Sequence, residues 1–138
     1  LMNKTIGIDI ESYNALFQQA QNNHQSLNEP IPEISSESKN KIEYILNVPF
    51  QRVFGKLLYW GFYKKASILF YLMIKNHPLS NGNKRMACYS LVLFYDINKR
   101  RFNLSSEKLY ELTYYTVNSD SNKYEETINY IANFLKHN

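Results

Sequence analysis

Apolar residues recur at helical intervals along most of the chain. Between residues 62 and 73 they fall at positions i, i+4, i+7, i+8 and i+11, which is the stripe of a helix that buries one face. This stripe consists of Phe62, Ala66, Leu69, Phe70 and Met73. Weaker versions of the same pattern predict further helices at residues 12–22, 41–46, 106–117 and 122–136.

Another strong helix is predicted from residue 83 to residue 98. Its apolar residues cover nearly the whole circumference: Met86, Ala87, Leu91, Val92, Leu93 and Phe94. A helix that is apolar all round is usually buried, so we expect this one at the centre of the fold.

Three segments lack helical periodicity. Residues 25–40 are polar and contain two prolines, which predicts a loop. Residues 48–60, the segment that we call the flap, are apolar without a pattern and could form a short hairpin. Residues 76–82 must form a loop, because Pro78 disfavours helix at His77 and Asn-Gly is a turn signal. The sequence therefore predicts one all-α domain over residues 1–138, a helical bundle with a short flap.

Composition narrows the class of protein. The chain has 138 residues, 44% of them hydrophobic and 20% charged, which is typical of a globular domain. It has one cysteine and no apolar run near 20 residues, so we expect a cytoplasmic location and no membrane contact. We also expect no signal peptide, although a chain that begins at Leu1 could be a fragment of a longer protein. The net charge of +4 suits phosphorylated ligands, and it is too small to predict nucleic-acid binding.

The chemistry that the sequence predicts is concentrated between residues 77 and 85. The loop Ser80-Asn81-Gly82-Asn83 opens into a helix, whose first N–H groups and positive dipole end favour an anion. Lys84 and Arg85 follow in the first turn, where their charges oppose the dipole unless an anion binds. His77, at the other end of the loop, could accept a proton from an attacking hydroxyl group.

The segment His-Pro-Leu-Ser-Asn-Gly-Asn-Lys-Arg, from His77 to Arg85, resembles the signature of the Fic/Doc family. That signature is His-x-Phe-x-(Asp/Glu)-(Gly/Ala)-Asn-(Gly/Lys)-Arg, and the likeness extends over about residues 42–102. The lysine at position 84 resembles the residue that the Doc branch has at this place in the signature. The resemblance implies a Fic/Doc-type bundle in which His77 is the catalytic base. It also implies that Ser80, Asn81, Gly82, Asn83, Lys84 and Arg85 bind the phosphates of ATP.

The resemblance implies partners and a metal as well. A Doc-like toxin would transfer a phosphoryl group from ATP with Mg²⁺ to a target protein, such as a translation factor, and a separate antitoxin chain would inhibit it. Two residues depart from the signature. Leu79 replaces the phenylalanine that anchors the loop, and we expect it to fill that role with less area. Asn81 replaces the acidic residue that holds Mg²⁺, so the metal would be held weakly.

Three other functions stay open. The first is the AMP transfer (AMPylation) of the Fic branch, which usually has glycine at the position of Lys84. The second is a degenerate binding module with weak catalysis, for which Asn81 is the evidence. The third is a basic nucleic-acid module, which the mild charge barely favours. The family's inhibitory helix motif, (Ser/Thr)-x-x-x-Glu-(Gly/Asn), is not expected here, since the segment 121–126 has its spacing but ends in Glu126.

Overall fold

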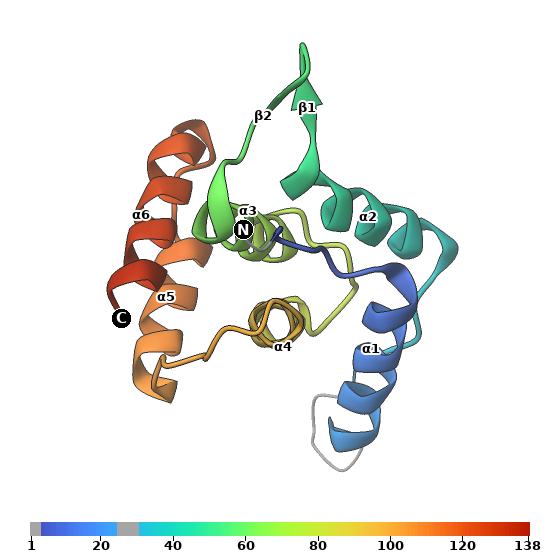
Figure 1. Cartoon of the computed structure of the whole chain (residues 1–138). Helices are drawn as coiled ribbons and strands as arrows, with labels where there is room; N and C mark the ends of the chain where they lie inside the picture. The colour runs from blue at the N-terminus through green and yellow to red at the C-terminus, as the bar shows by residue number, and fades with distance from the viewer. Residues whose placement is uncertain (1–3, 25–30) are drawn as a thin grey trace.

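A computed structural model describes residues 4–24 and 31–138, which form mostly helices and one small hairpin (Figure 1). The helices are α1 (Ile10–His24), α2 (Ser36–Asn47), α3 (Gly61–Lys75), α4 (Asn83–Ile97), α5 (Ser106–Val117) and α6 (Tyr124–His137). The short elements are the 3₁₀ turns η1 (Val48–Phe50) and η2 (Ser121–Lys123), and the strands β1 (Arg52–Val53) and β2 (Lys56–Leu57). The predicted all-α class is therefore confirmed.

Helix α3 lies at the centre of the fold. Ten of its fifteen side chains are buried, and it contacts α2, α4, α5, α6 and η1. The helix predicted at 83–98 is less central than α3. Helix α4 buries Met86, Leu91 and Phe94 against the core, but Val92 on its other side is 41% exposed. Burial of one face suffices for α4, because it packs against α1, α3 and α5 and leaves the remaining side open.

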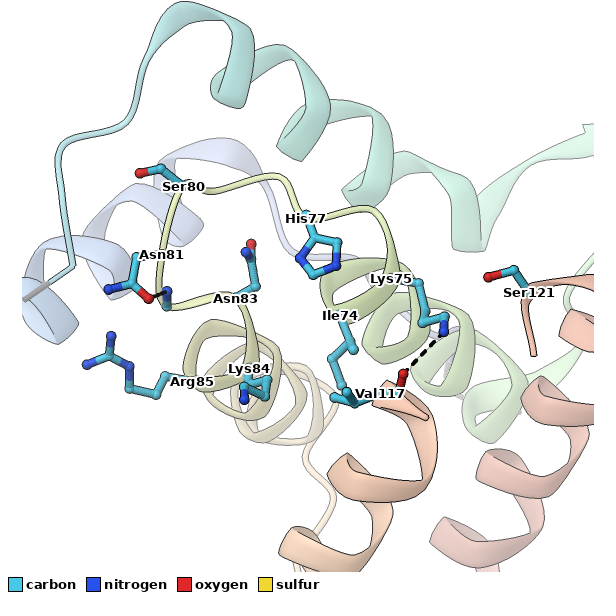
Figure 2. Close-up of a pocket in the computed structure, with 11 residues that line it drawn as sticks. Ile74, Lys75, His77, Ser80, Asn81, Asn83, Lys84, Arg85, Val117 and Ser121 are labelled. Atoms are coloured by element: carbon cyan, nitrogen blue, oxygen red, sulfur yellow. Dashed lines mark hydrogen bonds between the residues drawn. The ribbon is translucent and has the colours of Figure 1, made fainter. Parts of the chain in front are cut away.

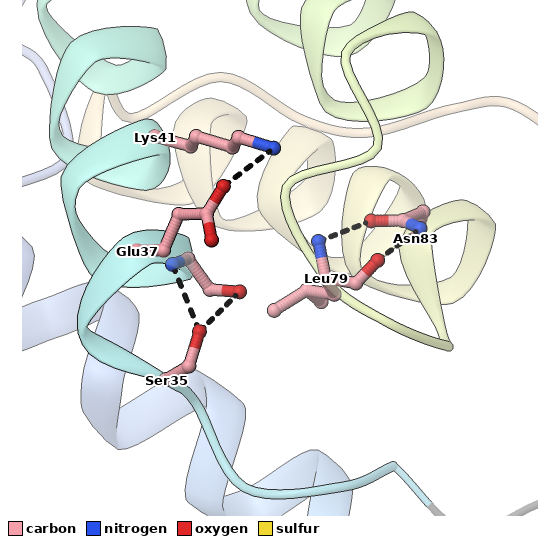
Figure 3. Close-up of polar contacts among 6 residues, drawn as sticks. Ser35, Glu37, Lys41, Leu79 and Asn83 are labelled. Atoms are coloured by element: carbon pink, nitrogen blue, oxygen red, sulfur yellow. Dashed lines mark hydrogen bonds and ion pairs between the residues drawn. The ribbon is translucent and has the colours of Figure 1, made fainter.

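Helix α2 begins earlier than the sequence pattern predicted. It starts at Ser36, so residues 36–40 of the predicted loop are helical, while residues 25–30 lie outside the described residues. The hydroxyl of Ser35 accepts a hydrogen bond from the backbone N–H of Ser38 at 3.1 Å, and Glu37 stands in the first turn (Figure 3). Both features stabilise a helix N-terminus, and they outweigh the polar composition of this stretch.

The flap contains the expected hairpin. Strands β1 and β2 pair antiparallel, with Arg52 opposite Leu57 and Val53 opposite Lys56. The two residues between them, Phe54 and Gly55, both have positive φ, as a tight two-residue hairpin turn requires. The hairpin projects away from the helices, and Phe54 at its tip is 99% exposed (Figure 1).

Helix length also bears on membrane contact. Within residues 4–24 and 31–138, every helix is too short or too polar to span a bilayer.

Candidate active site

The loop that connects α3 to α4 carries the predicted site. Helix α3 ends at Lys75, and the backbone of His77 then adopts a left-handed conformation with φ of 43°. This conformation is uncommon for residues other than glycine, although histidine adopts it more often than most. Leu79 is only 6% exposed and belongs to the hydrophobic core. The expectation that Leu79 anchors the loop is confirmed, and the exposed His77 lies just before this anchor.

Asn83 closes the loop with two reciprocal hydrogen bonds. Its Oδ1 accepts from the backbone N–H of Leu79, and its Nδ2 donates to the carbonyl of Leu79, both at 2.9 Å (Figure 3). The sequence predicted Asn83 as a phosphate-binding residue. Its side chain is engaged within the loop through Oδ1 and one Nδ2 hydrogen, which leaves the second Nδ2 hydrogen and the backbone N–H as the groups of Asn83 that could donate to phosphate.

Gly82 is the residue from which α4 starts. Its φ is 85°, and a Cβ atom placed there would come within 3.0 Å of Cγ1 of Ile31. Both the left-handed backbone and the close packing of Ile31 therefore favour glycine. As N-cap, Gly82 has no side chain that could bond to the first N–H groups of α4, and no acidic residue stands in the first turn. The first turn is thus electropositive and lacks a side-chain cap.

A cavity of about 680 Å³ lies over this helix N-terminus (Figure 2). All seven residues predicted from the sequence line it: His77, Ser80, Asn81, Gly82, Asn83, Lys84 and Arg85. Sequence reasoning missed four further lining residues, which are Ile74, Lys75, Val117 and Ser121. The structure therefore brings the predicted base and the predicted anion cradle to one cavity.

Lys75 is the most informative of the missed residues. Its Nζ donates to the carbonyl of Val117, the last residue of α5, at 3.4 Å (Figure 2). It also donates to the carbonyl of Ser119, just beyond α5, at 2.7 Å. It thereby ties the last turn of α3 to the far wall of the cavity. Its position two residues before His77 was a signal in the sequence, but the contact with α5 spans more than 40 positions and no local pattern reveals it.

The charge of the lining suits an anion. Lys75, Lys84 and Arg85 are basic, and the described residues that line the cavity include no aspartate or glutamate. Basic side chains and a helix N-terminus are features that favour phosphate groups as ligands. Glu125 of the segment with inhibitory-motif spacing lines a different cavity, together with Leu58 and Tyr59.

The residues of the cavity do not fit a magnesium ion held by the protein. Asn81 is neutral, and its Oδ1 accepts a hydrogen bond from the backbone N–H of Gly82 at 2.8 Å. Among residues 4–24 and 31–138, no three His, Cys, Asp or Glu side chains lie close enough together to bind a metal. Since Mg²⁺ prefers carboxylate and phosphate oxygens, it would have to be held by the phosphates of a ligand.

The single cysteine does not contribute to the site. Cys88 is half-buried on α4, as expected for a residue that fills space at the core, and its Sγ lies 3.5 Å from the hydroxyl of Thr113. Burial raises the pKa of the Cys88 thiol, which disfavours the nucleophilic thiolate.

The fold and the cavity together define a helical protein with a histidine beside an anion cradle at a helix N-terminus. Comparison with known families then identifies the family. Residues 8–95 match the Fic/DOC family, and the chain belongs to it. The match runs from the residues before α1 into α4 and includes the whole loop. No curated protein and no solved structure matches the chain. Family membership indicates a protein-modifying transferase, and the family generally uses a nucleotide.

Proposed function

We propose that this chain is a Doc-like transferase that moves the γ-phosphoryl group of ATP to a hydroxyl group of a target protein. One observation carries the proposal: His77 and the basic N-terminus of α4 line the same cavity. A base and an anion cradle at one place are what phosphoryl transfer to a hydroxyl group needs.

The chemical step uses these groups in turn. The target hydroxyl oxygen forms a bond to the γ-phosphorus while the bond from that phosphorus to the bridging oxygen breaks. The electron pair of the broken bond leaves with ADP, and the proton of the hydroxyl group passes to the imidazole of His77. The backbone N–H groups at the start of α4, with Lys84 and Arg85, stabilise the charge that develops on the phosphate oxygens.

Lys84 is the reason to favour phosphoryl transfer over AMP transfer. It is exposed, lies in the first turn of α4 and lines the cavity. Its side chain would crowd the cradle where the glycine of the AMP-transferring branch leaves room for the outer phosphates. ATP would then bind reversed, with its γ-phosphate toward the target hydroxyl.

A catalytically weak binding module is the second candidate. It is favoured by Asn81 and by the lack of carboxylates among the described residues that line the cavity. A replacement of Asn81 by aspartate keeps the oxygen that accepts from Gly82 and adds the missing charge. We expect Asn81→Asp to lower the Mg²⁺ concentration needed for half-maximal transfer, and an unchanged requirement would mean that the metal is bound elsewhere or unused.

The flap is the part of the chain that we assign to the target. Its strands have open edges, to which an extended segment of a target protein could add by strand pairing. The target would be a protein of the translation-factor class. The chain would act as the toxin of a toxin–antitoxin pair, with the antitoxin on a separate chain.

Transfer of label decides between the candidates. The purified protein is incubated with a cell lysate and with ATP that is labelled in either its α- or its γ-phosphate. We expect protein labelling from the γ-position only. Labelling from the α-position would establish AMP transfer, and a shift toward it in Lys84→Gly would identify Lys84 as the selecting residue. Absence of label from both would favour the binding module.

A further inference from the structure

The flap needs an external support to keep one orientation. Each of its strands has two residues, and an isolated two-stranded hairpin is marginal in water. Within residues 51–58 the hydrogen bonds run inside the hairpin or to its own ends, as from the N–H of Leu58 to the carbonyl of Gln51 at 3.2 Å. The direction in which the hairpin points is therefore set where its two ends join the helices, at Phe50 before β1 and at Tyr59 after β2.

Lys65 on α3 contacts both of these ends. It is only 5% exposed, and its Nζ donates a hydrogen bond of 2.6 Å to the carbonyl of Tyr59. The same ammonium group lies over the ring of Phe50, 5.8 Å from the ring centroid. A single buried cation thus connects the segment that enters the hairpin to the segment that leaves it.

Burial of this ammonium group has a cost. Desolvation lowers the pKa of Lys65, and the positive charge of Arg52 lowers it further. A methionine of similar length could fill the same space without desolvating a charge, but it could not donate to Tyr59. The contacts of Lys65 therefore hold the flap in one orientation, which an apolar side chain could not do.

We propose that Lys65 is a positioning residue that fixes the orientation of the flap toward the target protein. This inference rests on the proposed function, in which the flap aligns the target. Residues of the flap are not among the described residues that line the active-site cavity, so Lys65 acts on target presentation and leaves nucleotide binding unchanged.

The test compares Lys65→Met with a matched control, Lys64→Met. Lys64 is the preceding residue of the same helix, but its Nζ bonds to the side chain of Asn129 on α6 and not to the flap. Amide hydrogen exchange of residues 51–58 is measured in the protein alone. Trp60, the single tryptophan, is 73% exposed beside Tyr59, so its fluorescence anisotropy reports the mobility of the same region.

For Lys65→Met we expect exchange in the flap to rise by about tenfold, with lower Trp60 anisotropy, because a hydrogen bond from a charged donor is lost. Exchange within α3 and ATP affinity should stay at wild-type values, and label transfer into lysate proteins should fall. Lys65→Arg, which keeps a charged donor, should return exchange in the flap to near the wild-type rate. Lys64→Met should leave that rate unchanged.

Unchanged exchange and anisotropy in Lys65→Met would overturn the inference. Exchange that rises equally in α3 and the flap would also overturn it, since Lys65 would then serve general stability. The exchange measurement can fail or succeed independently of the proposed function. Flap exchange does not require activity, and a wild-type protein that transfers no label would refute only the function.

Discussion

Helices α4 and α5 begin in opposite ways. Helix α5 starts after Ser105, whose hydroxyl accepts from the N–H of Lys108 at 3.2 Å. Helix α4 starts after Gly82, which offers no side-chain bond. The second helical residue is Glu107 in α5 and Lys84 in α4, while the third is basic in both. The start of α5 thus stabilises the helix by itself, whereas the start of α4 would be completed by a bound anion.

The two helix starts differ in free energy, and the loop before α4 compensates for part of that difference. A serine cap contributes a few tenths of a kcal/mol more than a glycine cap, and each favourable charge near a helix terminus contributes about 0.3–1 kcal/mol. The start of α4 forgoes both contributions. Its geometry is nevertheless fixed, because Asn83 bonds twice to Leu79 and Leu79 is buried in the core. A rigid loop with unfavourable electrostatics is what a preorganised anion site requires.

The largest expected effect lies on the α4 side of this comparison, at His77. Because His77 has a left-handed backbone, asparagine is a better replacement than alanine, since it tolerates that conformation. We expect His77→Asn to reduce label transfer by about 10²–10⁴-fold while thermal stability and ATP affinity stay close to wild type. A variant that still transfers at the parent rate would exclude His77 as the base.

Asn83 should be the polar residue of this loop on which stability depends most. Asn83→Ala removes both bonds to Leu79, at about 1 kcal/mol each, so we expect about 2 kcal/mol of lost unfolding free energy and weaker ATP binding. The control is Asn118→Ala at the end of α5, where an exposed amide donates to the carbonyl of Tyr114. Denaturant unfolding of both variants gives the difference in unfolding free energy. Equal losses would show that the two bonds from Asn83 to Leu79 stabilise the protein no more than an exposed helix-end bond does.

The cap of α5 should matter for stability alone. Ser105→Ala is expected to lower the unfolding free energy by about 1 kcal/mol, because the N–H of Lys108 loses its acceptor. ATP affinity and label transfer should not change. If ATP binding weakens in this variant, the separation between a structural helix start and a ligand-binding one is mistaken.

The smallest expected effect is the change in stability when the charge in the first turn is reversed, and it has opposite signs in α4 and α5. Lys84→Glu should stabilise the protein without ligand by about 0.3–1 kcal/mol, since a negative charge at this position favours the dipole, yet it should weaken ATP binding. The mirror variant, Glu107→Lys in α5, should lose stability and leave ATP binding unaltered. Thermal unfolding with and without ATP measures both quantities, and a Lys84→Glu variant that binds ATP normally would remove Lys84 from the site.

Local signals in the sequence predicted more of this molecule than long-range contacts did. The stripe at 62–73 identified α3, and the segment 77–85 identified every polar residue of the loop that lines the cavity. The start of α2 was missed because two residues, the cap Ser35 and Glu37 in the first turn, outweigh the polar composition around them. The packing of Ile31 on Gly82 and the bond from Lys75 to α5 join distant parts of the chain, so only the folded structure reveals them.

The most direct test is a titration of the isotope-labelled protein with ATP and Mg²⁺, followed through its backbone amide resonances by NMR. The central claim is that the start of α4 binds the phosphates. We therefore expect the amides of Gly82, Asn83, Lys84 and Arg85 to shift most, while those of Ser106 and Glu107 at the start of α5 stay in place. Shifts that spare residues 82–85, or that fall equally on both helix starts, would contradict the account.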